Sequence, residues 1–146
     1  MMKKKQDITS EFAQAVIQVN TAFRQFIQQK FRQSKLDLTF EMFQVMVCLW
    51  QKDGVNQQEI AKAVQKNKAS VTPLIDNLVK IDLVTRSEDT VDRRNKIISL
   101  TNKGKDYKKK FAPMISEIYA SIKGDISDEK LKEITGLLLT VSRNMK

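Results

Sequence analysis

The chain has 146 residues, of which 41% are apolar and 29% are charged. These proportions describe a soluble globular protein, and no apolar run reaches the roughly 20 residues needed to cross a bilayer. The sequence contains no histidine, so it has no histidine general base, catalytic triad or histidine metal site. We therefore expect neither an enzyme nor a bound cofactor or metal, although an active site built from carboxylates alone stays open.

The net charge of +9 arises from 26 Lys and Arg against 17 Asp and Glu. The basic excess is concentrated in residues 1–35 and 66–110. A concentrated basic surface is typical of proteins that bind a polyanion, but a solvated surface explains the charge alone equally well.

Two features of the sequence concern the cellular compartment. The basic residues at positions 3–5 precede polar residues, which do not form the apolar core of a secretion signal. The single cysteine, Cys48, has no intrachain partner for a disulfide bond. We expect a protein of the reducing cytoplasm, with no membrane partner.

The first predicted element is a long helix, because apolar residues recur at steps of three and four between residues 8 and 27. Residues 34–38 break this pattern, and Thr39 can cap a second, strongly apolar helix over residues 40–52, which Gly54 would end. The apolar stripe of the first helix needs cover from another element.

Two shorter helices follow and predict a helix-turn-helix unit. Asn56 and Glu59 have the spacing of a capping box, which opens a helix that extends through Val64. Residues 65–67 make a tight connection to a helix over residues 68–81.

The pattern then changes its period. Residues 83–87 and 96–100 are β-prone and flank the charged stretch 88–95, which predicts a β-hairpin with a long polar tip. An amphipathic helix starts at residues 101–105, and Ser127 caps a last helix. The sequence thus predicts a mainly α fold with a small β-hairpin: a winged helix-turn-helix domain flanked by N- and C-terminal helices.

The helix over residues 68–81 has an outer face of small and polar side chains. This face consists of Ala69, Thr72, Pro73, Asp76 and Lys80, flanked by Ser70 and Asn77. Small side chains let a helix enter the major groove of DNA, where hydroxyls, amides and methyls contact base edges. A plain surface helix would look similar, and Asp76 is awkward near phosphate unless it pairs with Lys80 or accepts from a cytosine amino group.

The tip of the predicted hairpin carries Arg93 and Arg94. Guanidinium groups gain from the negative potential of a narrow minor groove, so a hairpin that follows a helix-turn-helix can place them there. Asp92 could hold Arg86 or a tip arginine and so set the shape of the hairpin, with the other acidic residues of the tip turned to solvent. A solvated loop with incidental charges is the alternative.

The stretch from residue 38 to residue 105 resembles the DNA-binding core of the MarR family of bacterial regulators. The matching segments are IAKAVQKNKASVTPLIDNLVKIDLVTR, residues 60–86, and DRRNKIISLTNKG, residues 92–104. The resemblance implies one MarR-like domain over residues 1–146. It comprises a winged helix-turn-helix lobe over residues 38–105 and dimerisation helices over residues 1–33 and 106–146.

The resemblance also implies a function. We expect a homodimeric, sequence-specific regulator of transcription that binds a pseudo-palindromic operator in double-stranded DNA and acts as a repressor relieved by a small molecule. The segment after Asn67 would enter the major groove and the hairpin tip the minor groove, while Asp92 would brace the hairpin. The expected DNA contacts come from Lys68, Ala69, Ser70, Thr72, Pro73, Asn77, Lys80, Arg86, Arg93, Arg94 and Lys96.

The chain departs from the family pattern at two positions. The family usually has glycine where this chain has Asp82, which leaves the turn into the first hairpin strand open. The run from residue 71 to residue 74 is similar to the organic-peroxide-sensing branch, but the reactive cysteine that this branch has near its N-terminus is absent. Cys48 lies on the apolar second helix, so we expect a buried structural thiol.

Members of the family often bind small aromatic or amphipathic ligands between the dimerisation helices and the DNA-binding lobe. Five residues of this chain could line such a space, namely Phe23, Met42, Met46, Trp50 and Tyr119. The same residues also fit a simple hydrophobic core.

The main rival hypothesis is a winged-helix module that has lost DNA binding and serves as a protein-interaction scaffold. Arg93 and Arg94 argue against it, because a scaffold does not need paired arginines at a hairpin tip.

Overall fold

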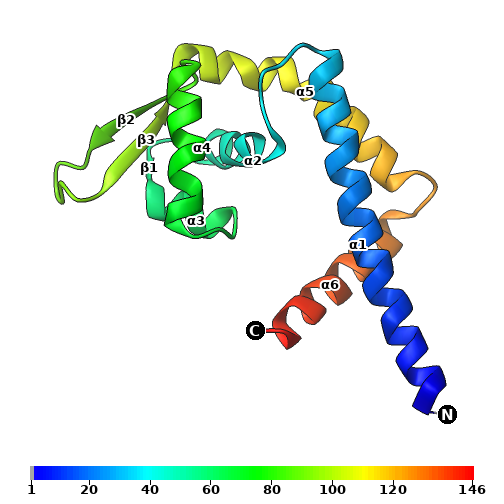
Figure 1. Ribbon diagram of the computed structural model, residues 1–146. Coiled ribbons are helices and arrows are strands. Elements are labelled where there is room, and N and C mark those ends of the chain that lie inside the picture. Colours follow the sequence, from blue (N-terminus) through cyan, green and yellow to red (C-terminus); the bar gives the residue numbers. More distant parts are fainter. Residues whose placement is uncertain (1) are drawn as a thin grey trace. The chain divides into compact units, whose positions relative to one another are not determined.

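The computed structural model describes the backbone of residues 2–146 and the side chains of residues 7–146. The chain divides into two compact units, one up to Phe111 and the other from Ala112 to Lys146. No helix in the described part of the chain is both long and apolar enough to span a membrane. In chain order (Figure 1) the elements are α1 (Met2–Gln33), α2 (Phe40–Gln51), β1 (Val55–Asn56), α3 (Gln57–Ala63), α4 (Lys68–Lys80), β2 (Val84–Glu88), β3 (Lys96–Leu100), α5 (Asn102–Lys123) and α6 (Asp128–Asn144).

Side-chain caps set the N-terminal ends of these helices. The predicted caps Thr39, Asn56 and Ser127 are confirmed, because the side-chain oxygen of each accepts from the backbone N–H three residues later. Asn67, which the sequence placed in a connection, caps α4 in the same way, with its Oδ1 2.8 Å from the backbone nitrogen of Ser70. These caps satisfy amide groups that have no partner within the helix.

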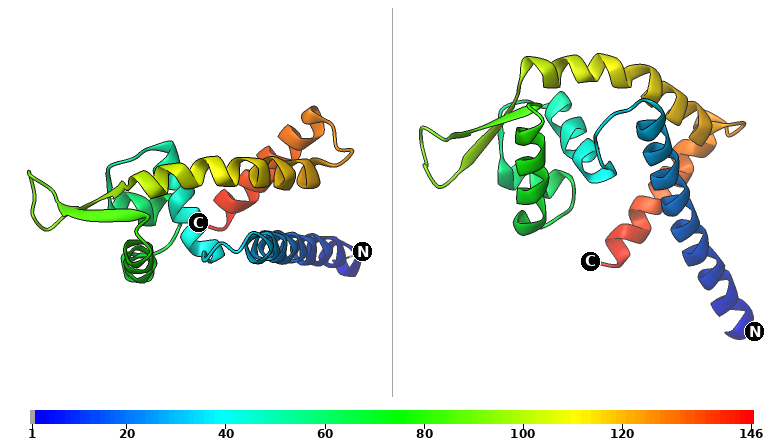
Figure 2. Two further views of the ribbon diagram at one scale, coloured as in Figure 1. Left: turned by 90° about the horizontal axis from the view of Figure 1, so that it is seen from above. Right: turned by 45° about the horizontal axis from the view of Figure 1, so that its top comes forward.

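The strands form a three-stranded antiparallel sheet in the order β1-β3-β2. The predicted hairpin is present as β2 and β3, with Glu88 opposite Lys96, and both views of Figure 2 show it projecting from the helices of its unit. The prediction of a two-stranded hairpin missed β1, where Val55 pairs with Ile98. A strand of two residues is too short to show the alternation that reveals strands in a sequence.

The core of the first unit is formed where α2, α3 and α4 meet the sheet. Its fully buried side chains include Leu49, Ile60, Ile75 and Ile98, one from each of these elements. Burial of each such side chain contributes roughly 1.5–3 kcal/mol before the entropic cost of folding is counted. The core therefore holds α4 by its inner face and leaves its outer face open.

A cluster of aromatic rings ties α1 and the start of α5 to α2. The rings of Phe31, Phe43 and Phe111 lie with their centroids 5.3 to 5.4 Å apart, and Trp50 lies 5.5 Å from Phe111. Edge-on and tilted ring pairs of this kind add about 0.5–1.5 kcal/mol each beyond their buried area. The Trp50 indole also donates to the backbone oxygen of Gly104 at 3.0 Å.

The connection between α4 and β2 is held by the residues that follow β3. Thr101 donates from its backbone to the Leu83 oxygen (3.1 Å) and from its hydroxyl to the Asp82 oxygen (2.6 Å). Gly104 comes so close that a Cβ atom there would lie 2.1 Å from the Leu83 oxygen. Any side chain at position 104 would push the start of α5 away from the segment that follows α4, because the Leu83 backbone oxygen cannot turn aside as a flexible side chain could.

The turn after α4 contains Asp82, at the position where glycine is usual. Asp82 has a φ of +64°, and its N–H donates to Val79 while the N–H of Leu83 reaches back to Leu78, both at 3.0 Å. This hydrogen-bond pattern is a Schellman motif, which needs a left-handed residue at its turn. The sequence left this turn open. In the structure Asp82 adopts the left-handed conformation that glycine usually has at this position.

The second unit contains the end of α5 and all of α6. Lys123 and Asp128 form an ion pair at 2.6 Å across the turn between the helices. The hydrogen bond from Lys123, together with its positive charge, lowers the pKa of the Asp128 carboxyl below its ordinary value. Asp128 also lies in the first turn of α6, where its negative charge interacts favourably with the positive end of the helix dipole.

We predict that Asp82→Gly stabilises the protein by about 1 kcal/mol, because a left-handed conformation costs a non-glycine residue roughly that amount. The measurement is the midpoint of urea unfolding. The matched control, Lys80→Gly, removes a residue with ordinary helical geometry and should lower the stability by up to about 1 kcal/mol. Equal effects of the two substitutions would contradict the role of the turn.

Candidate nucleic-acid interface

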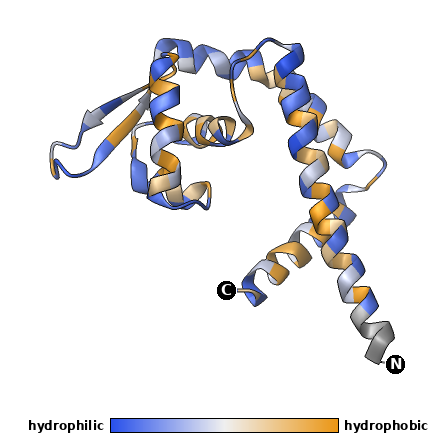
Figure 3. Ribbon diagram, viewed as in Figure 1, coloured by the Kyte–Doolittle hydropathy of each residue, from blue (hydrophilic) through white to orange (hydrophobic). Residues whose placement is uncertain are grey.

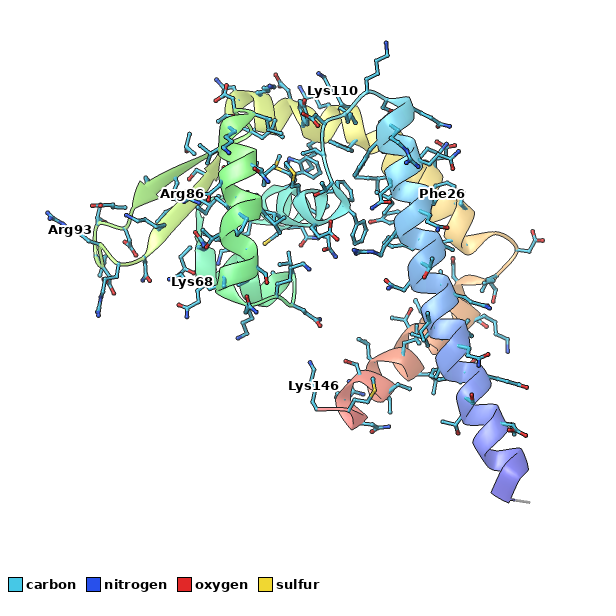
Figure 4. All side chains as sticks on the ribbon, viewed as in Figure 1. Phe26, Lys68, Arg86, Arg93, Lys110 and Lys146 are labelled. Atoms are coloured by element: carbon cyan, nitrogen blue, oxygen red, sulfur yellow. The ribbon has the colours of Figure 1, made fainter. Side chains whose placement is uncertain are left out.

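Most of the outer face of α4 is exposed, and Thr72 and Asp76 on it are half-buried. Val71, Ile75 and Leu78 are buried on its inner side. The exposed side chains, all of them predicted contacts, are Lys68, Ala69, Ser70, Pro73, Asn77 and Lys80. Figure 4 shows Lys68 at the N-terminal end of this helix. The structure thus brings six of the predicted contact residues onto one open helix surface.

Thr72 is the exception on this helix, because it is half-buried and its hydroxyl is engaged inside the protein. The hydroxyl donates to the backbone oxygen of Lys68 at 3.0 Å and accepts from the Gln57 side-chain amide at 2.5 Å. Gln57 is only 6% exposed and is the buried polar residue of the described chain. Sequence reasoning missed Gln57, since a glutamine at the start of a helix gives no signal that it is buried.

Arg86 on β2 pairs with Asp76 on α4, with Nη2 2.7 Å from Oδ1. This excludes the suggested pair of Asp76 with Lys80. Of the two partners suggested for Asp92, it excludes Arg86 and leaves a tip arginine. Figure 4 shows Arg86 between the hairpin and α4. The pair neutralises the carboxylate on the outer face and joins the hairpin to the helix.

The tip of the hairpin is shaped by two aspartates. Asp92 Oδ1 accepts from the backbone N–H of Arg94 at 3.0 Å and lies 3.3 Å from its Nε, while Asp89 Oδ1 accepts from the N–H of Val91 at 3.0 Å. Such aspartate turns fix the path of a short loop. The Arg94 side chain is 91% exposed, and Figure 4 shows Arg93 directed outward at the far end of the hairpin.

Of the two remaining acidic residues at the tip, Glu88 is exposed as predicted, whereas Asp89 is half-buried. Glu88 forms an ion pair with Lys96 across the hairpin, with Nζ 3.3 Å from Oε1. Lys96, a predicted DNA contact, is thus partly neutralised by a cross-strand partner. An exposed pair of this kind contributes little to stability, because water screens it.

A shallow polar hollow lies where the N-terminal ends of α3 and α4 meet the hairpin. It is lined by Asn56, Gln57, Gln58, Lys68, Asn95 and Lys96. Sequence reasoning placed only the two lysines at the DNA surface, because capping residues are not distinguishable from contact residues by their type. The hollow extends the polar surface from α4 toward the hairpin.

The residues predicted to line an effector pocket lie in different surroundings. Met42 and Met46 are buried in the core of the first unit, and the Phe23 ring packs edge-on against Phe40 at 5.8 Å. Trp50 belongs to the aromatic cluster, and Tyr119, in the second unit, is exposed. An effector site at these residues stays a prediction.

No group of three or more metal-binding side chains (Cys, Asp, Glu) is close enough to hold an ion in the part of the chain that the structure describes. The surface consists of a helix-turn-helix with an adjoining antiparallel sheet and a hairpin tipped by arginines. This arrangement defines a winged helix-turn-helix domain.

Comparison with known proteins finds similarity to one family over part of the chain. Residues 38–96 match the sequence profile of the MarR family. MgrA, an HTH-type transcriptional regulator of Staphylococcus aureus, is 26% identical over 104 residues, which are 71% of this chain and 69% of that protein.

Two solved structures are similar over most of their length. The S. aureus MepR–DNA complex has a TM-score of 0.84 and 26% identity, over 92% of this chain and 98% of that one. Bordetella bronchiseptica BpsR has a TM-score of 0.79 and 24% identity, over 90% of this chain and 98% of that one. The fold and site define a winged helix-turn-helix regulator of transcription. The similarity to the MarR family profile covers residues 38–96, which include α2, α3, α4 and β2.

Cys48 lies on α2 as a half-buried free thiol. Burial raises the pKa of this thiol above its ordinary value, and the negative charge of Glu59 raises the pKa further. Since the thiolate is the reactive form, a raised pKa makes the thiol less reactive at neutral pH. The sequence predicted a buried thiol, and the structure has it half-buried; its structural role stays a prediction.

We predict that iodoacetamide alkylates Cys48 more slowly in the native protein than in urea, with the pH midpoint of the reaction shifted upward. A pKa that is higher in the native protein than in the unfolded chain also links folding stability to pH. The contribution of Cys48 to stability is present below the ordinary thiol pKa of about 8.5 and is lost as the pH rises through the higher native value. Mass spectrometry gives the rates, and Glu59→Gln should bring the midpoint part of the way back. Native alkylation as fast as in urea at about pH 7.5 would refute the assignment.

Proposed function

We propose that this regulator binds double-stranded DNA sequence-specifically, with the N-terminal half of α4 in the major groove and the hairpin, here called the wing, in the adjacent minor groove. The observation that carries the proposal is that the open face of α4 and the arginine-tipped wing belong to one compact unit. A major groove about 12 Å wide admits a helix with small outer side chains.

The charge distribution on this surface suits a polyanion. Asp76 and Asp92, which would repel phosphate, are each engaged by an arginine. Arg93 makes no ion pair with a described side chain, so its guanidinium is available at the tip. A guanidinium inserted in a narrow minor groove gains from the enhanced negative potential there.

We further propose a homodimer, because amphipathic helices leave apolar faces uncovered. In α6 no side chain is buried, and Leu137 and Leu138 are 59% and 44% exposed. In α1 the exposed apolar residues include Ile8 and Phe12, and Figure 3 shows apolar residues along both helices. A second copy of the chain would cover such faces symmetrically, and the paired α4 helices would then read a palindromic operator.

The remaining expectations follow from this function. DNA binding of BpsR is regulated by 6-hydroxynicotinic acid, and we propose for this chain a repressor that a small aromatic or amphipathic ligand releases from its operator. A regulator of this kind acts in the cytoplasm, where bacterial DNA is, and its work needs no catalytic step. The rival hypothesis of a protein-interaction scaffold predicts no affinity for DNA.

The first test uses a duplex selected from a random pool by the wild-type protein. We predict that Arg94→Ala weakens binding of this duplex by at least about 1 kcal/mol, or about fivefold in Kd, because one wing contact is lost. Lys132→Ala on α6 removes the same charge away from the interface and should leave the Kd unchanged.

The same titrations repeated at several salt concentrations separate the scaffold from the regulator. The affinity should fall by about 0.9 log units per tenfold increase in salt for each phosphate contacted. A flat salt dependence, or no enriched duplex at all, would reject the proposed function.

The second test concerns the dimer. We predict that Leu138→Glu weakens self-association by about 100-fold or more, since burying an unpaired carboxylate costs several kcal/mol. Light scattering after gel filtration measures the mass. Lys132→Glu places the same side chain on the opposite face of α6 and should leave the dimer intact. A dimeric Leu138→Glu variant would mean that this face is not the interface.

A further inference from the structure

The outer face of α4 carries an apolar strip within its polar surroundings. Ala69, Thr72 and Pro73 follow one another at helical spacing, which places them side by side on one face. Ala69 and Pro73 are exposed and Thr72 is half-buried. The Ala69 and Pro73 side chains have no polar atom, so the chemistry of the strip depends on what Thr72 offers.

The hydroxyl of Thr72 has one proton to donate, and that proton is committed to the Lys68 backbone oxygen at 3.0 Å. The Gln57 amide donates to the same hydroxyl oxygen at 2.5 Å. Thr72 therefore cannot donate to an acceptor on a base edge without breaking a bond inside the protein. The hydroxyl keeps one acceptor position but no donor, and its γ-methyl group is the part of the side chain that makes no polar contact.

Gln57 has a structural reason to keep this arrangement. It is 6% exposed, and a buried amide that loses its acceptor incurs a desolvation penalty. Rotating the Thr72 side chain about χ1 to point its oxygen at DNA would take this acceptor away from the Gln57 amide. Gln57 thus acts as a positioning residue, which turns a hydroxyl-bearing side chain into an apolar contact.

We propose that Ala69, Thr72 and Pro73 form an apolar strip that reads the 5-methyl groups of thymines in the major groove, with Thr72 contributing its methyl and not its hydroxyl. The thymine methyl is the apolar group that base edges present in this groove. The inference rests on the proposed function, because it names the chemistry by which α4 distinguishes one duplex from another. Sequence type alone would assign Thr72 a hydrogen bond.

The experiment uses the selected duplex and its copies in which single thymines are replaced by deoxyuridine, which lacks only the methyl group. For wild-type protein at least one thymine in each half-site should show a loss of about fourfold in affinity, the factor that burial of one methyl-sized group supplies. Binding insensitive to every replacement, or a selected site without thymine, would overturn the proposal.

Two substitutions of Thr72 separate its methyl from its hydroxyl. Thr72→Ser keeps the hydroxyl and removes the methyl, so it should bind the thymine duplex about fourfold more weakly and lose discrimination at one thymine. Thr72→Val keeps the methyl and removes the hydroxyl, so it should retain both affinity and discrimination. The opposite pattern, with Ser retaining them and Val losing them, would show hydrogen-bond readout and refute the proposal.

A further variant guards against a folding defect. Thr72→Val leaves the Gln57 amide without an acceptor and can lower the Tm, whereas the double substitution Gln57→Leu/Thr72→Val removes both polar partners together. The double variant should recover the Tm and still discriminate thymine from deoxyuridine. A folded double variant that binds the duplex without discrimination would contradict the proposal, whereas enrichment of no duplex by the wild type would reject the proposed function itself.

Discussion

The close approach of two backbone segments, residues 81–83 and 101–104, is the constraint on which the interface depends. Three consecutive carbonyl groups at the end of α4 accept hydrogen bonds from Thr101 and Lys103. The absence of a side chain at Gly104 lets the two segments meet. Because the wing strands leave from these same segments, the direction of the wing is set by the position of α4.

An ion pair adds a second contact between the wing and α4. Arg86 on β2 bonds to Asp76 on α4, so the wing is attached to the helix by a side-chain pair as well as by its backbone. In the proposed complex, helix and wing would meet two grooves of one duplex without first being ordered relative to each other, which would limit the entropy lost on binding. The acidic residues of the surface are part of this architecture and do not oppose its positive charge.

The structure also shows that the residue type on a surface does not define what a partner meets. Thr72 is polar by composition, yet its hydroxyl is used within the protein. Asp92 is acidic, yet it serves the turn that carries Arg94. In both cases a hydrogen bond inside the protein decides which atoms remain for a ligand, because a side-chain group has few donors and acceptors to share.

The sequence by itself determined the order of the elements, most of their caps, the helix-turn-helix and the arginine-tipped hairpin. These features are recorded in periodicity and in capping contacts between residues three apart, such as Asn56 and Glu59, which act within a few residues of the chain. Only the tertiary structure decided the partner of Arg86, the orientation of Thr72 and the presence of β1. Each depends on residues distant in sequence, as Gln57 is from Thr72, and packing brings such residues together where no local pattern records the contact.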